Sequence, residues 1–426
     1  MDRGAPTPVR RLDALHVYYG IEFFEDVARH AAFTVLAVYL VQDVGLNPLE
    51  LVLIGTVGEI SYFLLEVPTG AIADTYSRRT SVILGLFVNG LSAVMFGLTH
   101  EYTVLLAASV LWGLGSALMS GAYEAWITDE HGVEGITRVF LRGSQWAYAG
   151  AIVGAIAGVA VATQDLGAAV IFGGILWIAT GVACLVVMPE HGFRRRPVHE
   201  RLSPVRELRR NASAGARVIR GHHVLLLIVG ITFFAGAASE GLDRLWEAHF
   251  IRDVGLPELW GLDPVVWFGV FNVIGLSAGI VVTSFLVPRF RDAGDAQLAG
   301  ALLVLTGVLS AAMIVFGLAG AFVLAAVAYL VARLARRITE PLYAAWLNRN
   351  IEDSSIRATV NSLVGQSDAI GEIAGGPAIG VVGTVSGMRA ALVASGLLLT
   401  PALALYGRAL KHGGREPELE EAEAPA

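Results

Sequence analysis

The chain has 426 residues, of which 55% are hydrophobic and 16% are charged, and its mean hydropathy is +0.63. A soluble core cannot bury so much apolar surface, so the composition excludes a soluble globular protein and indicates one whose solvent is lipid. The net charge of −7 includes an acidic tail from Glu416 to Glu423, and the single cysteine, Cys184, excludes a disulfide framework.

Apolar stretches of about 20 residues, the length that crosses a bilayer, recur along the whole chain. They predict an all-α membrane protein with about twelve transmembrane helices, six in each half. The first stretch is too long and too acidic to be a cleaved signal. The predicted spans are 14–41, 50–73, 81–99, 103–128, 139–163, 167–188, 223–251, 264–287, 298–318, 321–347, 358–383 and 389–410.

The first predicted helix carries Glu22, Glu25, Asp26 and Arg29 at a spacing that places them on one face. Each charge would cost about 2.5–3.5 kcal/mol at the middle of the bilayer, so the stripe must face protein or water. We expect the three acids to carry coupling protons and Arg29 to contact substrate. The alternative is a set of static ion pairs or a watery vestibule.

The junction of the second and third helices contains Gly70, Asp74, Arg78 and Arg79. Gly70 is expected to let a neighbouring helix approach closely. Asp74 can accept hydrogen bonds from a helix N-terminus or an arginine, and the two arginines hold the turn on the cytoplasmic side. These residues predict a conformational latch that forms in one state and breaks in the other.

Aromatic and acidic residues of the second and fourth helices supply further candidates. Tyr62 could offer a stacking surface to a flat organic substrate, and Glu124 could bind a polar part of it. Packing is the alternative role for such aromatic residues. Trp126 and Trp346 lie near cytoplasmic helix ends, where they are expected to act as membrane-interface anchors.

Arginines gather in the loops on one side of the predicted membrane, whereas the opposite loops carry only Arg252 and Arg389. The positive-inside rule therefore predicts a protein of the inner cell membrane with both termini and the central loop in the cytoplasm. The predicted organisation is a first bundle over 1–188, an arginine-rich linker over 189–222, a second bundle over 223–410 and a disordered acidic tail over 411–426.

Charged residues also recur at helical spacing in the seventh, tenth and eleventh helices. Acids outnumber bases in the spans, so some carboxylates must hold protons or bind a cation. We expect Asp368 and Glu372 to join the proton-coupling group. The expected substrate-binding residues in these helices are Glu240, Asp243, Arg244, Arg333, Arg336, Arg337 and Glu340.

The two halves of the chain repeat one pattern. Gly20 to Phe24, followed by Asp43 to Leu46, recurs as Gly230 to Phe234 followed by Asp253 to Leu256. The offset is 210 residues in both cases, since 230 − 20 and 253 − 43 are equal. An internal duplication of hydrophobic helices predicts two pseudo-symmetric bundles, the architecture of alternating-access carriers.

The junction sequence resembles the loop signature of the major facilitator superfamily, G-x-L-A-D-x-x-G-R-R/K, through Gly70, Asp74, Arg78 and Arg79. With the helix number and the duplication, the resemblance covers about residues 14 to 410. It implies two six-helix bundles around a central cavity lined chiefly by the first, fourth, seventh and tenth helices. Many drug/proton antiporters of the superfamily have an arginine where this chain has Ser109, and a Gly-Pro in the fifth helix that is missing here, which weakens an antiporter assignment.

The sequence contains no phosphate-binding loop, metal-spaced His/Cys set or nucleophile elbow, so we expect no enzyme, cofactor, metal site or nucleic-acid partner. The prediction is a monomeric secondary active transporter that moves a small organic solute by alternating access, with proton-coupled efflux preferred. Its partners are the solute, the proton and the lipid bilayer. The alternatives are a proton symporter that imports a polar nutrient or organic anion, and a non-transporting receptor or lipid-handling protein.

Overall fold

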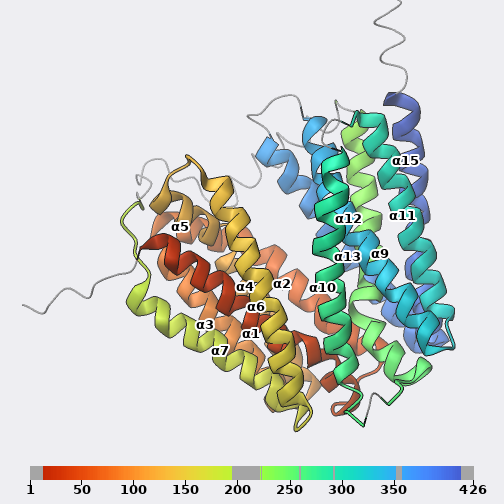
Figure 1. Cartoon of the computed structure of the whole chain (residues 1–426), viewed down its shortest axis with the longest axis horizontal. Coiled ribbons are helices and arrows are strands. Elements are labelled where there is room, and N and C mark those ends of the chain that lie inside the picture. The colour runs from red at the N-terminus through yellow and green to blue at the C-terminus, as the bar shows by residue number, and fades with distance from the viewer. Residues whose placement is uncertain are drawn as a thin grey trace, which may run out of the picture. The chain divides into compact units, whose positions relative to one another are not determined.

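The computed structural model describes residues 13–193, 221, 223–258, 261–290, 293–351 and 357–413. Most of the predicted arginine-rich linker and nearly all of the acidic tail lie outside the described residues. The described residues are almost entirely helical (Figure 1).

The first half of the chain forms seven helices. Four of their N-termini are capped by side chains that satisfy free backbone N–H groups. The accepting residues are Asp13 for Leu15 N, Asn47 for Glu50 N, Ser77 for Thr80 N and Asp165 for Ala168 N. The helices are α1 (Ala14–Gln42), α2 (Pro48–Thr75), α3 (Arg78–Leu98), α4 (Tyr102–Met119), α5 (Ala122–His131), α6 (Ile136–Ala162) and α7 (Leu166–Val187).

The fourth predicted span, 103–128, corresponds to one stretch long enough to cross a membrane, Tyr102–His131, but its helix is interrupted. It ends as α4 at Met119 and resumes as α5 at Ala122. Gly121 between them has φ of +68°, a conformation that a residue with a Cβ adopts only with strain. The regular helical hydrogen bonding is therefore interrupted between α4 and α5.

The second half forms a similar series of helices. The twelfth predicted span is divided near Pro401, whose nitrogen has no hydrogen to donate to the preceding turn. The elements are α9 (His223–His249), the π-helix η2 (Phe250–Val254), α10 (Val266–Leu286), the 3₁₀ helix η3 (Val287–Phe290), α11 (Asp295–Leu318), α12 (Phe322–Arg349), α13 (Arg357–Ser386), α14 (Met388–Leu398) and α15 (Thr400–Gly413).

Ten helical stretches among the described residues are long and apolar enough to cross a membrane, with α4–α5 and α14–α15 each forming one stretch. The two remaining long helices, α1 and α12, carry the charged stripes that were predicted to face water. The sequence prediction of an all-α membrane protein with twelve spanning helices is confirmed.

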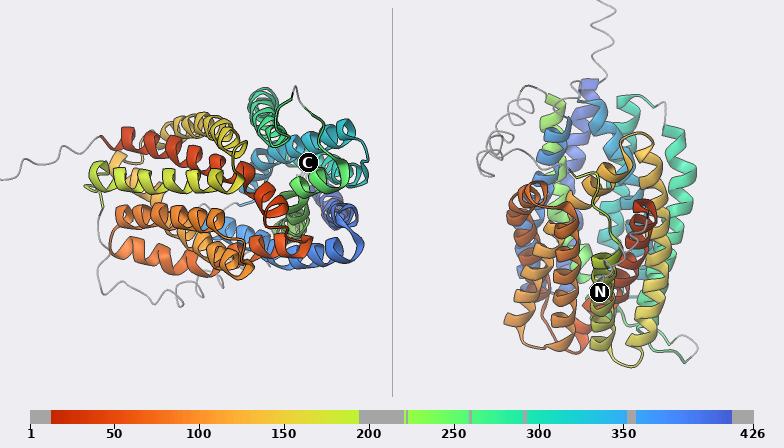
Figure 2. Two further views of the ribbon diagram at one scale, coloured as in Figure 1. Left: turned by 90° about the horizontal axis from the view of Figure 1, so that it is seen from below. Right: turned by 90° about the vertical axis from the view of Figure 1, so that its left-hand side faces the viewer.

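The chain divides into two compact units (Figure 2). Unit 1 comprises Met1–Tyr39 and Ile60–Pro204, and unit 2 comprises Leu40–Glu59 and Val205–Ala426. The end of α1 and the first part of α2 therefore pack with the second half of the chain. Within each unit, long helices run side by side (Figure 2).

The same close helix packing occurs once in each unit. In unit 1, glycines of α6 lie directly against backbone carbonyls of α1, and in unit 2 glycines of α13 lie in the same way against α9. Subtracting 210 from the α9 numbers and 221 from the α13 numbers superimposes one set on the other. The contacts are Gly150 on Phe23 O, Gly154 on Val27 O, Gly371 on Phe233 O and Gly375 on Ala237 O. The duplication thus conserves backbone-to-backbone packing that only small residues permit.

Candidate functional site

The charged stripe of α1 borders a cavity of about 300 Å³ in unit 1. Glu22, Glu25, Asp26 and Arg29 all line it, as their helical spacing predicted. The rest of the wall comes from α3, α4 and α5, and consists of Asn89, Trp112, Ser116, Met119 and Tyr123, together with Ile21 of α1.

One guanidinium faces three carboxylates in this cavity. Arg29 Nη2 donates to Asp26 Oδ1 and lies 3.6 Å from Glu25 Oε2. Asp26 is 5% exposed, and His30 Nδ1 lies 3.4 Å from its Oδ1. Glu22 lies beside the hydroxyl of Tyr123 instead. Ion pairing with Arg29 alone therefore leaves the lining of this cavity with a surplus of acid.

A second cavity, of about 230 Å³, lies inside unit 2. Its charged lining residues are Arg336 and Glu340 of α12 and Asp368 of α13. The lining also includes apolar residues, among them Leu309 and Met313 of α11. The cavity thus has both charged and hydrophobic lining residues, the usual character of a site for a small organic molecule.

Arg336 forms an ion pair with another acid of unit 2, Asp243 of α9. Its Nη1 lies 2.7 Å from Asp243 Oδ1 and 2.6 Å from Asp243 Oδ2. Glu340 and Asp368 also interact electrostatically with this guanidinium. One arginine therefore serves three carboxylates here as well.

Arg244 of α9 belongs to a neighbouring acidic cluster that includes Glu59 of α2, and it also interacts electrostatically with Asp243. Its Nη2 lies 3.5 Å from Glu59 Oε1 and its Nε lies 3.6 Å from Glu240 Oε2. Glu372 of α13 interacts electrostatically with Glu59, Glu240 and Arg244. The predicted candidates Glu240, Arg244 and Glu372 are thus brought together, with Glu59 as an additional member.

Two other arginines of α12, Arg333 and Arg337, do not line the unit 2 cavity. Arg333 lies over the ring of Tyr329, with Cζ 5.7 Å from the ring centroid. Arg337 packs along α10, where a Cβ added to Gly279 would meet its Cδ at 2.8 Å. Of the three α12 arginines that we expected to bind substrate, only Arg336 lines the described unit 2 cavity.

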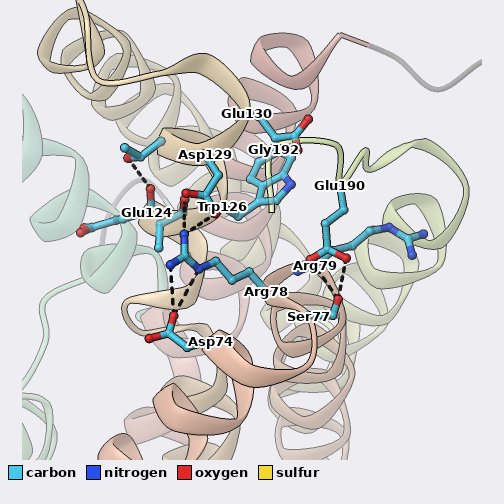
Figure 3. A network of polar contacts seen from close by, with 12 residues as sticks. Asp74, Ser77, Arg78, Arg79, Glu124, Trp126, Asp129, Glu130, Glu190 and Gly192 are labelled. Carbon is cyan, nitrogen blue, oxygen red and sulfur yellow. Dashed lines mark hydrogen bonds and ion pairs between the residues drawn. The ribbon is translucent and has the colours of Figure 1, made fainter. Parts of the chain in front are cut away.

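Tyr62 and Glu124 line neither cavity. The Tyr62 hydroxyl lies 3.2 Å from Glu66 Oε1 and 3.0 Å from Ser120 Oγ, across from the break between α4 and α5. Glu124 lies on α5 beside the polar network around Arg78 (Figure 3). A direct role of these two residues in substrate binding stays a prediction.

The predicted latch residues Asp74, Arg78 and Arg79 belong to a dense network at one end of unit 1 (Figure 3). Arg78 bonds to Asp74 at 3.1 Å and to Asp129 of α5. Arg79 donates to three carbonyls at the end of α7, Leu185 O at 2.6 Å, Met188 O at 2.8 Å and Cys184 O at 3.4 Å. No atom of the described residues beyond its own helix lies within 4 Å of a Cβ built on Gly70, so the close approach expected there is not made.

The segment after α7 folds back onto this network (Figure 3). Glu190 accepts hydrogen bonds from Ser77 Oγ at 2.8 Å and from Arg79 N at 2.9 Å. The indole of Trp126 donates to Pro189 O at 2.7 Å. Residues 189–193 therefore pack with the first bundle, although the sequence placed them in the linker.

The expectation that Trp126 and Trp346 are interface anchors is wrong. Their exposed fractions are 1% and 2%, so neither indole reaches lipid headgroups. The apolar volume of each ring fills the interior of its unit, and the hydrogen bond of Trp126 stabilises the turn after α7.

An arginine of η2 joins the two parts of unit 2 that are far apart in sequence. Arg252 Nη2 donates to Val41 O at 3.2 Å and to Leu46 O at 2.8 Å, and so satisfies free carbonyls after the last turn of α1. Nearby, Leu49 N donates to Thr384 Oγ1 at 3.2 Å. These bonds hold residues 40–59 within unit 2.

Several residues of these sites were not singled out from the sequence. Asn89, Trp112 and Ser116 complete the unit 1 cavity, and only their place in three dimensions reveals it. Asp129 and Glu190 could have been suspected, because they are acids at helix ends on the side where the arginines gather.

Charged stripes in helices that span a membrane, with cavities of about 230 and 300 Å³ beside two of them, are typical of a multi-pass membrane transporter. The sequence profile of the Major Facilitator Superfamily matches residues 19–351, and the chain belongs to this family. The family is one of transporters and not of enzymes, and it implies a small-molecule substrate. The chain is 24% identical over 400 residues to YxaM of Bacillus subtilis strain 168, described as an uncharacterized MFS-type transporter, and the match covers 92% of this chain and 95% of that protein.

Solved structures share the fold at low sequence identity. The nucleoside transporter NupG matches with a TM-score of 0.73 and 12% identity, over 94% of this chain and 100% of that one. A bacterial homolog of the human lysosomal transporter Spinster, inward-facing and unoccupied, matches with a TM-score of 0.74 and 16% identity, over 97% and 98%. These likenesses establish the fold of a secondary transporter.

Proposed function

We propose that the chain exchanges protons for a small organic solute and exports the solute across the inner cell membrane, with both termini in the cytoplasm. The observation that carries this proposal is the unit 1 cavity, where Glu22, Glu25 and Asp26 share the single guanidinium of Arg29. Unpaired charge at membrane depth is costly, so the surplus acids must take up protons or another cation.

Among these acids, Asp26 is the one whose protonation would change the most contacts in the cavity. It is buried, it bonds to Arg29, and its backbone and side chain both contact His30. When Asp26 is neutral, Arg29 is left with Glu25 as its nearest partner in the stripe. Protonation would therefore rearrange the pairing on one face of α1, and α1 is the helix whose outer end belongs to unit 2.

The bonds of residues 40–59 support alternating access. Arg252, Thr384 and Arg244 hold this segment within unit 2, while the rest of α1 and α2 belongs to unit 1. A carrier that opens first to one side and then to the other must release such contacts in each cycle. Their polar character lets water replace each bond at modest cost.

The test uses everted membrane vesicles that hold an acidic interior, with candidate solutes found by a thermal-stability screen of the purified protein. An exporter that exchanges protons moves solute into these vesicles while protons leave, whereas a symporter moves both in one direction. Asp26→Asn is expected to abolish proton-driven uptake and to leave counterflow exchange measurable. Asp43→Asn, an exposed acid on the loop after α1, is the matched control.

Two results would refute the proposal. Proton and solute that enter together would show import by symport. Binding without any flux would show a receptor. Full proton-driven uptake by Asp26→Asn would remove that residue from the coupling step.

A further inference from the structure

The unit 2 cavity has a chemical polarity that specifies its ligand. We infer that this cavity binds an organic ammonium ion, with the N–H groups at Asp368 and Glu340 and an apolar part against Leu309 and Met313. The inference rests on the proposed transport function and names the substrate class.

The first argument is the balance of charge. Arg336 is the single base that lines the cavity among the described residues, and it is held by both oxygens of Asp243. Glu340 and Asp368 also face this guanidinium, so three carboxylates surround one positive charge. A ligand that carries positive charge reduces this surplus of negative charge, whereas an anion would increase it and would have to displace Asp243 from a two-point bond.

The second argument is the direction of the hydrogen bonds. The hydroxyls of Thr232, Ser239 and Thr339 line the cavity, and each already donates its proton to a carbonyl of its own helix, at 2.9, 2.8 and 2.9 Å. A hydroxyl that has given its proton can only accept. Among the polar groups of the lining, these three hydroxyls and the two carboxylates therefore offer acceptors, which suit a ligand that donates.

The third argument is the apolar part of the lining. Leu309, Met313 and Leu399 come from α11 and the turn between α14 and α15, and they offer neither charge nor donor. The unit 1 cavity has fewer apolar lining residues and four charged ones. The unit 2 cavity therefore offers carboxylates for an ammonium group and apolar residues for a hydrophobic group, whereas the unit 1 cavity offers mainly charged residues.

The two carboxylates of the unit 2 cavity also suit an exchange of an ammonium ion for a proton. A proton on Asp368 or Glu340 and an ammonium ion neutralise the same surplus charge, so binding of one opposes binding of the other. Mutual exclusion of this kind is what an exchanger requires, because a site that held both would carry them in one direction.

The experiment measures binding to the full-length purified protein by calorimetry with three probes of similar size. These are phenethylammonium, phenethyl alcohol and phenylacetate, which carry a positive charge, no charge and a negative charge on one aromatic scaffold. The ammonium is expected to bind most tightly. Asp368→Asn is expected to weaken it about ten- to one-hundred-fold, the effect of one charge-assisted hydrogen bond, and to leave the alcohol unchanged.

Glu340→Gln is also expected to weaken binding of the ammonium. Its matched control is Glu101→Gln, which changes an exposed acid before α4. Tighter binding of phenylacetate, equal binding of the three probes, or no binding of any of them would overturn the inference. Filling the apolar wall with Leu309→Phe must also weaken the ammonium, and an unchanged affinity there would place the ligand elsewhere. Since binding is measured without a gradient, failure of proton-driven flux in vesicles would refute the proposed function and leave this result intact.

Discussion

The glycine contact between α6 and α1 allows a prediction with a calculable size. In Gly154→Ala, the new Cβ would lie 2.8 Å from Val27 Cα and closer still to Val27 O, whereas real Cβ atoms essentially never come within 3.0 Å of a neighbour. The helix α1 cannot move aside, because Gly173 of α7 meets Ala28 O on another side of it. Overpacking of this kind costs about 1–3 kcal/mol.

For a unit of this size, each kcal/mol lowers the melting temperature by about 2–4 °C, so the expected loss is about 2–12 °C. The chain offers its own reporter. Cys184 is the one cysteine of the sequence and is 2% exposed in α7, so a thiol-reactive dye fluoresces only when unit 1 opens.

Gly20→Ala on α1 is the matched control, because a Cβ there meets nothing within 4 Å. It is expected to leave the melting temperature unchanged or to raise it, since alanine favours a helix over glycine by about 0.5–1 kcal/mol. A melting temperature of Gly154→Ala at or above that of the wild type would show that this packing does not hold the unit together.

Three further perturbations test other parts of the structure. Trp126→Phe removes the donor to Pro189 O and should lower the free energy of unfolding by about 0.5–1.5 kcal/mol. The Cys184 thiol should then be labelled at a lower temperature, and an unchanged melting curve would contradict this. Asp74→Asn weakens the bond to Arg78 and should slow solute exchange while the equilibrium affinity stays the same; wild-type turnover would exclude a latch. Arg252→Gln removes the bonds to the end of α1 and should speed amide hydrogen exchange over residues 40–59; unchanged protection there would show that these bonds do not hold the segment.

The helices were predictable because a backbone that crosses lipid has no water to bond to and must form its hydrogen bonds internally. A spanning segment must satisfy its own hydrogen bonds, so length and hydropathy nearly suffice to find it. The exceptions are local. The break at Gly121 depends on a positive φ that a hydropathy window does not detect, and the burial of Trp126 depends on Pro189, which lies sixty-three residues further along the chain.

The sites were predictable in part, for a different reason. Residues on one face of α1 share that face whatever surrounds the helix, so the stripe around Asp26 was found and does line a cavity. Pairing between helices has no such local rule. Arg333 lies over Tyr329, four residues earlier on α12, which helical spacing allows. Arg336 and Arg337 contact Asp243 of α9 and the region of Gly279 on α10, and only the packing of those two helices decides this.

The duplication itself shows which features of a carrier are free to diverge. The glycine contacts at Gly154 and Gly375 repeat in register, because a larger side chain there would separate the helices. The charged stripe does not repeat: Glu240 minus 210 falls at position 30, eight residues beyond Glu22, a rise of about 12 Å along the helix. If each bundle had kept the same charges at the same depth, both cavities would compete for the same ligand. With one stripe displaced along a conserved frame, the unit 1 cavity is mainly polar and the unit 2 cavity is amphipathic, and this asymmetry is what the proposed exchange of protons for an organic cation requires.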